Sequence, residues 1–415
     1  MSAHQRPVIA VVGGGVSVAA LSSELGRALD TDGLELRLAA RDLDRLHVIA
    51  RHCTEAFADA DRGFVATACR SLAEAVDGAD AIVLMIRVGG LMARAVDESF
   101  PDAFGIAGDE GLGPGGHANA LRTLPVLDSL TGTLLRHARR TPILNLVAPL
   151  GLTTRLLLDR GLPAVGVCEL PVVTERALRA CWPPGAAVDV TYAGFNHLGW
   201  FWTGHDATTV FGEAMRRRLV DADVLARFGA VPLKYYYALF DAAAAARVGL
   251  ARPRGRAHEL MRLTAQALAD FEATPGRPSP AIAARPTPWF SDALVPILGS
   301  LLGGQPWRGY ANLRNDGLIP ALPADVVIEA AATFTGRTVE PHAPESDIPP
   351  VVLSFLERLA HAEQLVYRAS PHRDVGLIVD ALVDGPWALP KGQAGDVANA
   401  ILAAADAHTS AAASI

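Results

Sequence analysis

The strongest constraint on the fold is the opening stretch of residues 7–29, which reads "PVIAVVGGGVSVAALSSELGRAL". A short apolar run leads into three glycines, and Leu21 and Leu25 then recur at helical spacing. This order predicts a buried strand, a tight turn and a helix, in which glycines let a pyrophosphate approach the helix N-terminus. Val18 fills the place of the third glycine, so a purely structural turn stays open as an alternative. We predict that a dinucleotide binds this turn through Gly13, Gly14, Gly15, Val16 and Ser17.

Further strands follow the first at intervals filled by helical patterns. "LELRLA" alternates with period two, Ala81 to Ile86 is a buried run, and "PILNLVAPLG" and "PAVGVCELP" are two more short apolar runs. Strands that alternate with helices predict a parallel, doubly wound sheet. The first part of the chain therefore reads as a Rossmann-like α/β domain.

The pattern changes after "YAGFNHLGWFWTG". Residues 206–272 are expected to be mostly helical, residues 272–289 are Pro-rich and irregular, and one strand and two amphipathic helices follow. A chain of 415 residues also exceeds one ordinary core. We therefore predict a doubly wound nucleotide domain, residues 1–196, and a helix-rich α+β domain for substrate, metal and oligomerisation, residues 197–415.

Composition narrows the class of protein. The net charge is −7 without a run of like charges, so neither nucleic acid nor a membrane surface is an expected partner. No apolar segment approaches the roughly 20 residues of a membrane helix, and the N-terminus reads as a strand rather than a signal peptide. Four cysteines in a chain of this length form no disulfide framework. We expect a cytoplasmic protein.

The end of the second strand should carry an acid for the ribose hydroxyls. It reads "LAARDLD", which puts Arg41 near that place. An arginine there could meet a 2′-phosphate, so NADP stays open beside NAD, and a solvated loop residue is an equal alternative.

Cys168 and His197 are the candidate metal ligands, in "GVCELP" and "GFNHLGWF". A thiolate and an imidazole suit a divalent transition metal, from Mn to Zn. Two protein ligands are too few for a closed structural zinc site, so they would suit an open site completed by substrate and water. From spacing alone, an ordinary buried cysteine is the stronger interpretation.

The order of several blocks is more specific than any one of them. Together they resemble the family 4 glycoside hydrolases over about residues 8–330, in the blocks "GGG", "RVGGLMARAVDE", "GDEGLGPGG", "ALRTLP", "NLVAPLG", "GVCELP", "GFNHLGW" and "NLRNDGLIPALP". The resemblance implies an NAD- and metal-dependent enzyme on glycosides, often 6-phosphorylated ones, with Mn²⁺ as the expected ion. It implies oxidation at the sugar C3, a metal-stabilised enolate, removal of the C2 proton by a tyrosine, and elimination of the leaving group.

The resemblance also implies roles for single residues. Cys168 and His197 match the metal ligands, Glu169 matches an acid that protonates the leaving group, and Arg87 and Asn145 fall in blocks near the cofactor. The matches to substrate-binding positions are Arg94, Glu110, Asn196 and Asn312. Ordinary alternatives are a surface carboxylate for Glu169, helix salt bridges for Arg94 more than for Arg87, and turn formation for Asn312 and, more strongly, Asn315.

Two departures from the family pattern bear on the activity. The second asparagine of "N-x-x-N-P" is Ala148, which removes a polar contact. The tyrosine block reads "GAVPLKYYYALF". Alignment on "GAVP" makes Tyr235 the base, whereas alignment on "LKYYY" puts Pro232 there and leaves none. Core packing is a further alternative for three adjacent tyrosines.

The leading hypothesis is an NAD- and metal-dependent glycosidase acting on a sugar or sugar phosphate. The alternative is an NAD(P)-dependent sugar oxidoreductase or epimerase without hydrolysis, and a ligand-binding protein that has lost turnover is a third class. A homodimer or homotetramer is expected by resemblance.

Overall fold

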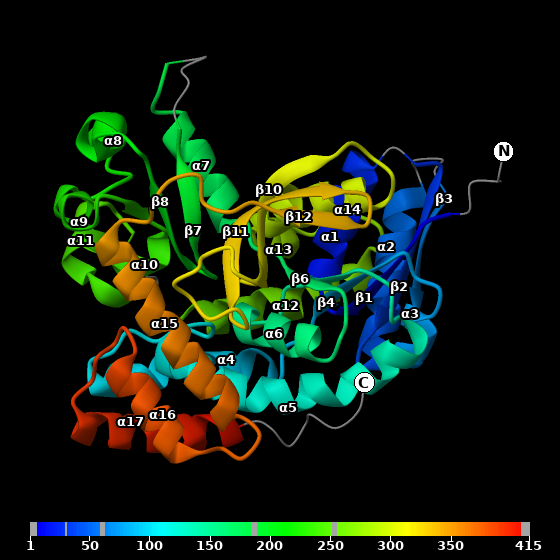
Figure 1. The fold of residues 1–415 in the computed structure, drawn as a ribbon. Coiled ribbons are helices and arrows are strands. Elements are labelled where there is room, and N and C mark those ends of the chain that lie inside the picture. The colour runs from blue at the N-terminus through cyan, green and yellow to red at the C-terminus, as the bar shows by residue number, and fades with distance from the viewer. Residues whose placement is uncertain (1–5, 30, 59–62, 184–188, 251–254, 408–415) are drawn as a thin grey trace.

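The computed structural model describes residues 6–29, 31–58, 63–183, 189–250 and 255–407. Within these residues, twelve strands form one sheet in the order β3-β2-β1-β4-β5-β6-β10-β11-β7-β8-β9, with β12 paired to β11 (Figure 1). The strands are β1 (Val8–Gly13), β2 (Gly33–Ala39), β3 (Gly63–Ala68), β4 (Ala81–Met85), β5 (Ile143–Asn145), β6 (Ala164–Gly166), β7 (Thr191–Phe195), β8 (Leu198–Trp202), β9 (Val231–Pro232), β10 (Trp307–Arg314), β11 (Val327–Thr335) and β12 (Thr338–Pro341).

Strands β1 to β6 form the predicted parallel, doubly wound sheet. Along β1 the side chains alternate between two cores. Ile9 and Val11 pack with one cluster, and Ala10 and Val12 pack with the other. Because both faces of a strand are then covered, the strand reads as a continuous apolar run, as in the sequence.

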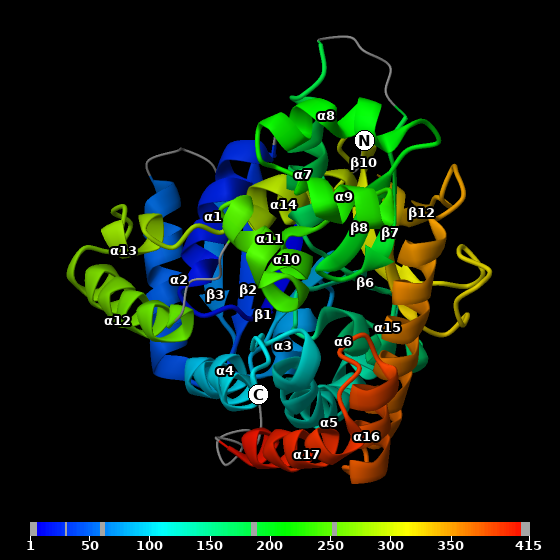
Figure 2. The same ribbon diagram turned by 90° about the vertical axis from the view of Figure 1, so that its left-hand side faces the viewer.

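Helices cover both faces of the sheet (Figures 1 and 2). Apolar residues of α1, α2, α12 and α14 pack on one face, and those of α3, α5, α6 and α16 pack on the other, while α15 contributes apolar residues to both clusters. The α-helices are α1 (Ser17–Ala28), α2 (Leu43–Ala58), α3 (Leu72–Val76), α4 (Gly90–Ser99), α5 (Gly113–His137), α6 (Leu150–Asp159), α7 (Leu170–Arg179), α8 (Ala207–Arg216), α9 (Ala222–Phe228), α10 (Lys234–Phe240), α11 (Ala242–Arg247), α12 (Arg256–Ala273), α13 (Pro280–Ala283), α14 (Val295–Leu301), α15 (Pro350–Ala369), α16 (Val375–Asp384) and α17 (Lys391–Asp406).

The second half extends the same sheet with antiparallel strands. β10 pairs with β6, β11 follows it, and the hairpin β7–β8 completes the row with β9. Strands β10 and β11 come from the C-terminal half yet lie between β6 and β7. The sequence predicted only one strand near β11, and it offered turn formation as the alternative role of Asn312. That alternative was wrong, because Asn312 lies inside β10.

The observed helices agree better with the prediction from the sequence than the strands of the second half do. The described part of residues 206–272 is mostly helical, and the Pro-rich stretch is irregular apart from the short α13. No helix among the described residues is long and apolar enough to cross a membrane. The carboxyl ends of β1, β4, β5 and β6 lie at one edge of the sheet, which is where ligands bind in such folds.

Candidate active site

The glycine turn after β1 has the backbone that only glycine adopts freely. Gly13, Gly14 and Gly15 have φ of 89°, 84° and 52°. A Cβ on Gly13 would lie 2.7 Å from the Met85 carbonyl oxygen, so β4 passes too close for any side chain. In this described segment, no side chain caps α1 and its first turn carries no acid. A helix N-terminus of this kind fits the pyrophosphate of a dinucleotide.

The position after β2 that would bind the ribose hydroxyls of a dinucleotide carries no obvious acid. Arg41 is exposed directly after β2. Asp42 Oδ1 accepts a hydrogen bond of 3.0 Å from the Arg45 backbone N–H, so this carboxylate caps α2. The roles of Arg41, Val16 and Ser17 toward a cofactor stay predictions.

Cys168 and the β7–β8 turn meet beside β6. The Asn196 amide hydrogen-bonds the Cys168 thiol, which is 4% exposed. His197 follows Asn196 directly, with a φ of 67° that histidine seldom adopts. Backbone strain of this kind often accompanies a functional site. The two predicted ligands thus belong to one locality at the carboxyl edge of the sheet.

The chemistry of these donors fits a divalent cation. Burial, and then the charges of Lys234 and Arg94, lower the pKa of His197 to about 3, and its Nδ1 is buried without a partner among the described residues. A neutral imidazole with an open nitrogen is the form that binds metals. Burial, then Glu329 and Glu169, raise the pKa of Cys168 well above its usual range, which a cation would reverse.

The donor set is small. Within the described residues, no group of three or more His, Cys, Asp or Glu side chains could hold a metal ion by itself. The described residues therefore form no closed structural metal site, and the open site at Cys168 and His197 stays a prediction.

Tyr235 has different surroundings from the two tyrosines that follow it in α10. Its ring stacks on His197, with centroids 4.3 Å apart and an interplanar angle of 12°. Tyr236 and Tyr237 are 3% and 1% exposed and belong to the core. Pro232 lies in β9. This placement favours the alignment that makes Tyr235 the base.

Two charged groups lie beside this stack. The Lys234 ammonium is 5.7 Å from the centre of the Tyr235 ring. Glu169 Oε2 is 3.9 Å from Cys168 Sγ. Burial raises the pKa of Glu169, and Lys234 opposes that shift. A carboxyl group whose pKa is raised by burial suits the predicted acid role.

A cluster of guanidinium groups faces the same region. Glu110 pairs with both Arg87 and Arg94, and Arg94 also pairs with Glu98 at 2.8 Å. Burial, then Arg94 and Arg285, lower the pKa of Arg87 to about 9. Arg285 is likewise near Arg94, because that charge, after burial, lowers its pKa to about 10. Sequence reasoning missed Arg285, since it stands in the Pro-rich segment without a motif.

Two of the predicted site residues form hydrogen bonds to other residues of the protein. The Asn145 amide donates to Thr153 and Thr154, and its Oδ1 accepts from the Val147 N–H at 3.1 Å. The Asn312 amide donates to Glu329 Oε1 at 2.8 Å. Their roles toward cofactor and substrate stay predictions. Asn315 forms a turn, as its alternative interpretation expected, through bonds to Ile319 and Leu322.

Glu329 is a second residue that sequence reasoning missed. It is fully buried in β11, and burial raises its pKa to about 7, against hydrogen bonds from Tyr192, Asn312 and Asn196. The sequence feature that could have identified Glu329 is its place as a lone acid within the apolar run "VVIEAAATF".

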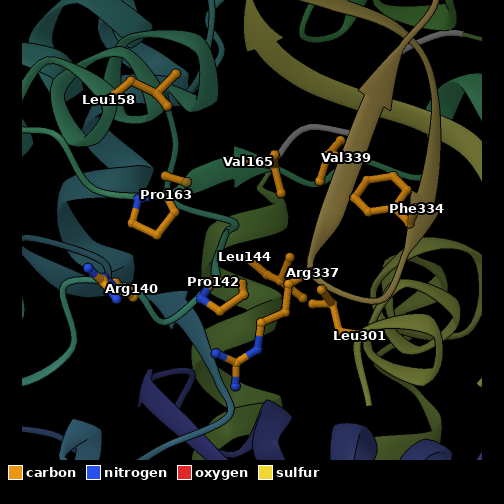
Figure 3. Close-up of a pocket in the computed structure, with 11 residues that line it drawn as sticks. Arg140, Pro142, Leu144, Leu158, Pro163, Val165, Leu301, Phe334, Arg337 and Val339 are labelled. Carbon is orange, nitrogen blue, oxygen red and sulfur yellow. The ribbon is translucent and has the colours of Figure 1, made fainter. Parts of the chain in front are cut away.

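A cavity of about 250 Å³ lies at the opposite edge of the sheet (Figure 3). Pro142 and Pro163, which precede β5 and β6, line it together with Arg140 and Arg337. None of the predicted site residues lines this cavity, so it is separate from the candidate active site.

Comparison with known proteins decides the family. The model of family 4 glycosyl hydrolases matches residues 8–182, and the model of the C-terminal domain of this family matches residues 192–387. The chain belongs to glycosyl hydrolase family 4. The predicted resemblance and the prediction of a glycoside hydrolase enzyme are thereby confirmed.

Individual family 4 relatives are distant in sequence. The chain is 26% identical over 347 residues to a 6-phospho-beta-glucosidase of Thermotoga maritima, which covers 80% of this chain and 82% of the relative. It is 22% identical over 377 residues to an alpha-galacturonidase of Thermoanaerobacterium saccharolyticum, with 77% of each covered. A solved structure of the Thermotoga maritima enzyme has a TM-score of 0.78 at 23% identity and covers 96% of this chain and 98% of that one. The predicted fold class is confirmed.

Proposed function

We propose that this family 4 member is an NAD- and divalent-metal-dependent glycosidase whose substrate carries an anionic group, with a 6-phosphoglycoside as the first choice. The observation that carries the proposal is the stack of Tyr235 on a neutral His197, next to Cys168. It brings a tyrosine phenol, an imidazole and a thiol to the edge of the sheet where the glycine turn lies.

Both cofactors have residues that fit them. The Thermotoga maritima relative was solved with manganese, NAD⁺ and glucose-6-phosphate. Here the glycine turn would receive the dinucleotide, and Cys168 with His197 would hold Mn²⁺ or a similar ion. When bound, NAD supplies a hydride acceptor and the ion supplies a Lewis acid.

The residues of the chain divide the proton transfers between them. Tyr235 removes the proton from C2 of the sugar, and the nearby Lys234 ammonium favours the phenolate. Glu169 protonates the departing glycosidic oxygen, a role for which its raised pKa suits it. Arg87, Arg94 and Glu110 form one ion-pair network that holds cofactor and sugar.

The arginine cluster supports an anionic substrate. Besides burial, the charges of Arg94 and Arg285 lower the pKa of Arg87, and the charge of Arg94 lowers that of Arg285, so an anion placed among these groups relieves repulsion. Guanidinium groups bind phosphate and carboxylate in bidentate fashion. The two relatives act on a 6-phosphoglucoside and on a galacturonide, which carry these two groups.

The proposal also covers the roles of the two parts of the chain and the oligomeric state. We propose that residues 1–196 bind the nucleotide, that residues 197–415 supply the base and part of the anion site, and that the chain acts as a homo-oligomer.

The test is incubation with aryl glycosides, NAD and Mn²⁺ under reducing conditions. Three substrates are compared: a 6-phospho-β-glucoside, a galacturonide and an unmodified glucoside. We expect release of the aryl alcohol from an anionic substrate, dependent on NAD and without net NADH. Net NADH or an epimerised sugar without release would instead establish the oxidoreductase or epimerase.

A further inference from the structure

Glu329 is a carboxylate buried at the centre of the sheet. It lies in β11, opposite Asn312 of β10 and Gly194 of β7, and it is 0% exposed. Three donors surround its side chain. Tyr192 OH donates to Oε2, and the amides of Asn312 and Asn196 donate to Oε1 at 2.8 Å and 3.4 Å.

In the described structure, this carboxylate has no cationic side chain as a direct partner. Among the described residues, neither a hydrogen bond nor an ion pair joins it to a lysine or an arginine. Its electrostatic neighbours, Cys168 and Glu169, are acids themselves. A buried charge without a counter-charge is costly, so a cation placed close to this carboxylate would stabilise its charged form. The cation that the site accommodates is the divalent ion proposed at Cys168 and His197.

Glu329 also connects to that site through one side chain. The Asn196 amide contacts both Glu329 Oε1 and the Cys168 thiol. Since both carboxylate oxygens of Glu329 already accept hydrogen bonds, the side chain is placed to orient its neighbours and not to ligate an ion. Outer carboxylates of this kind fix ligand orientation and raise ligand basicity.

We propose that Glu329 is a positioning residue of the cation site, which holds Asn196 against Cys168 and places a negative charge beside the ion. The proposal rests on the proposed function, because it assumes that a divalent ion binds Cys168 and His197. It concerns the affinity for the ion, which can be measured without substrate or turnover.

The test is a Mn²⁺ titration of the protein followed by electron paramagnetic resonance, without NAD or sugar. We expect Glu329→Gln to weaken Mn²⁺ binding by about 10–100-fold, the usual effect of losing an outer-shell partner. NAD affinity, read from protein fluorescence, stays unchanged. Glu329→Asp, which keeps the charge, recovers part of the loss.

Glu175→Gln is the matched control. Glu175 accepts a hydrogen bond of 2.9 Å from Tyr310 OH, as Glu329 does from Tyr192, yet no hydrogen bond joins it to Asn196 or Cys168 in the described structure. It should leave Mn²⁺ affinity at the wild-type value. An equal loss in both variants, or no loss in Glu329→Gln, would overturn the proposal.

A second variant serves if Glu329→Gln does not fold. Asn196→Ser removes the amide in the β7–β8 turn that links Glu329 to Cys168. We expect it to weaken Mn²⁺ binding as well. Wild-type affinity in that variant overturns the proposal. If the wild-type protein itself binds no Mn²⁺, the metal of the proposed function fails instead.

Discussion

His197 shows how much a single residue determines in this site. Its left-handed backbone belongs to the β7–β8 turn, and its ring stacks on Tyr235. Burial keeps the imidazole neutral, so it can act as a metal ligand near neutral pH without losing a proton. The pH dependence of metal binding should therefore come from the thiol of Cys168.

Cys168→Ser tests that expectation. A hydroxyl is a poorer ligand than a thiolate for a transition metal, so we expect weaker Mn²⁺ binding and low activity that excess Mn²⁺ partly restores. The measurement is activity against Mn²⁺ concentration, with Cys181→Ser, another buried cysteine, as control. Full activity of Cys168→Ser without added metal would exclude the thiol as a ligand.

Tyr235→Phe tests the base. Loss of the phenol should lower kcat by about 10²–10⁴-fold, the usual contribution of general acid–base catalysis. Exchange of the C2 proton with solvent deuterium, followed by NMR, should disappear, while NAD and Mn²⁺ still bind. Tyr236→Phe, in the core, is the control. Unchanged exchange in Tyr235→Phe would assign the base to another residue.

Helices α4 and α5 are joined by a buried ion pair. Asp97 and Arg122 side chains are each 1% exposed, and Arg122 also donates to the Val88 carbonyl next to Arg87. We expect Arg122→Met to destabilise the protein by about 3–5 kcal/mol, because it leaves Asp97 buried without a partner. Thermal unfolding measures the loss. Arg160→Met, which breaks an exposed pair with Asp128, should cost about 1 kcal/mol or less.

Helix α15 carries a pH-sensitive carboxyl. Burial raises the pKa of Glu363 to about 8, although Arg155 opposes the shift. The folded state then binds a proton that the unfolded state releases at lower pH, so this group costs stability as pH rises from about 4.5 to 8. We expect the unfolding temperature of Glu363→Gln, relative to wild type, to increase over that range. Glu357→Gln, an exposed site on the same helix, should show no such trend.

At the scale of the whole molecule, the sequence predicted what depends on neighbours along the chain. The strand–turn–helix at Gly13 and the alternation of β1 to β6 follow from local periodicity. It could not predict what depends on long-range pairing. Asn312 reads as a loop residue until β10 pairs with β6, and Arg285 and Glu329 join the site only because distant segments fold onto it.

That long-range pairing predicts how the molecule unfolds. Asn312 of β10 pairs with Gly166 of β6, and Ala330 of β11 pairs with Ala193 of β7, so the C-terminal half supplies the middle of the sheet. In Figure 2, α17 also lies against α5. We expect a single calorimetric transition with a calorimetric to van't Hoff enthalpy ratio near one.

NAD should stabilise the whole molecule, so the single transition moves to higher temperature. At an NAD concentration a hundred times its Kd, we expect the free energy of unfolding to rise by about 2.7 kcal/mol. A fragment of residues 1–183 provides the complementary measurement. It lacks β10, so the edge of β6 is exposed, and we expect it to show no cooperative unfolding by circular dichroism. Two separate transitions in the full chain, only one of them moved by NAD, would instead show that the nucleotide domain is stable without the strands inserted beside it.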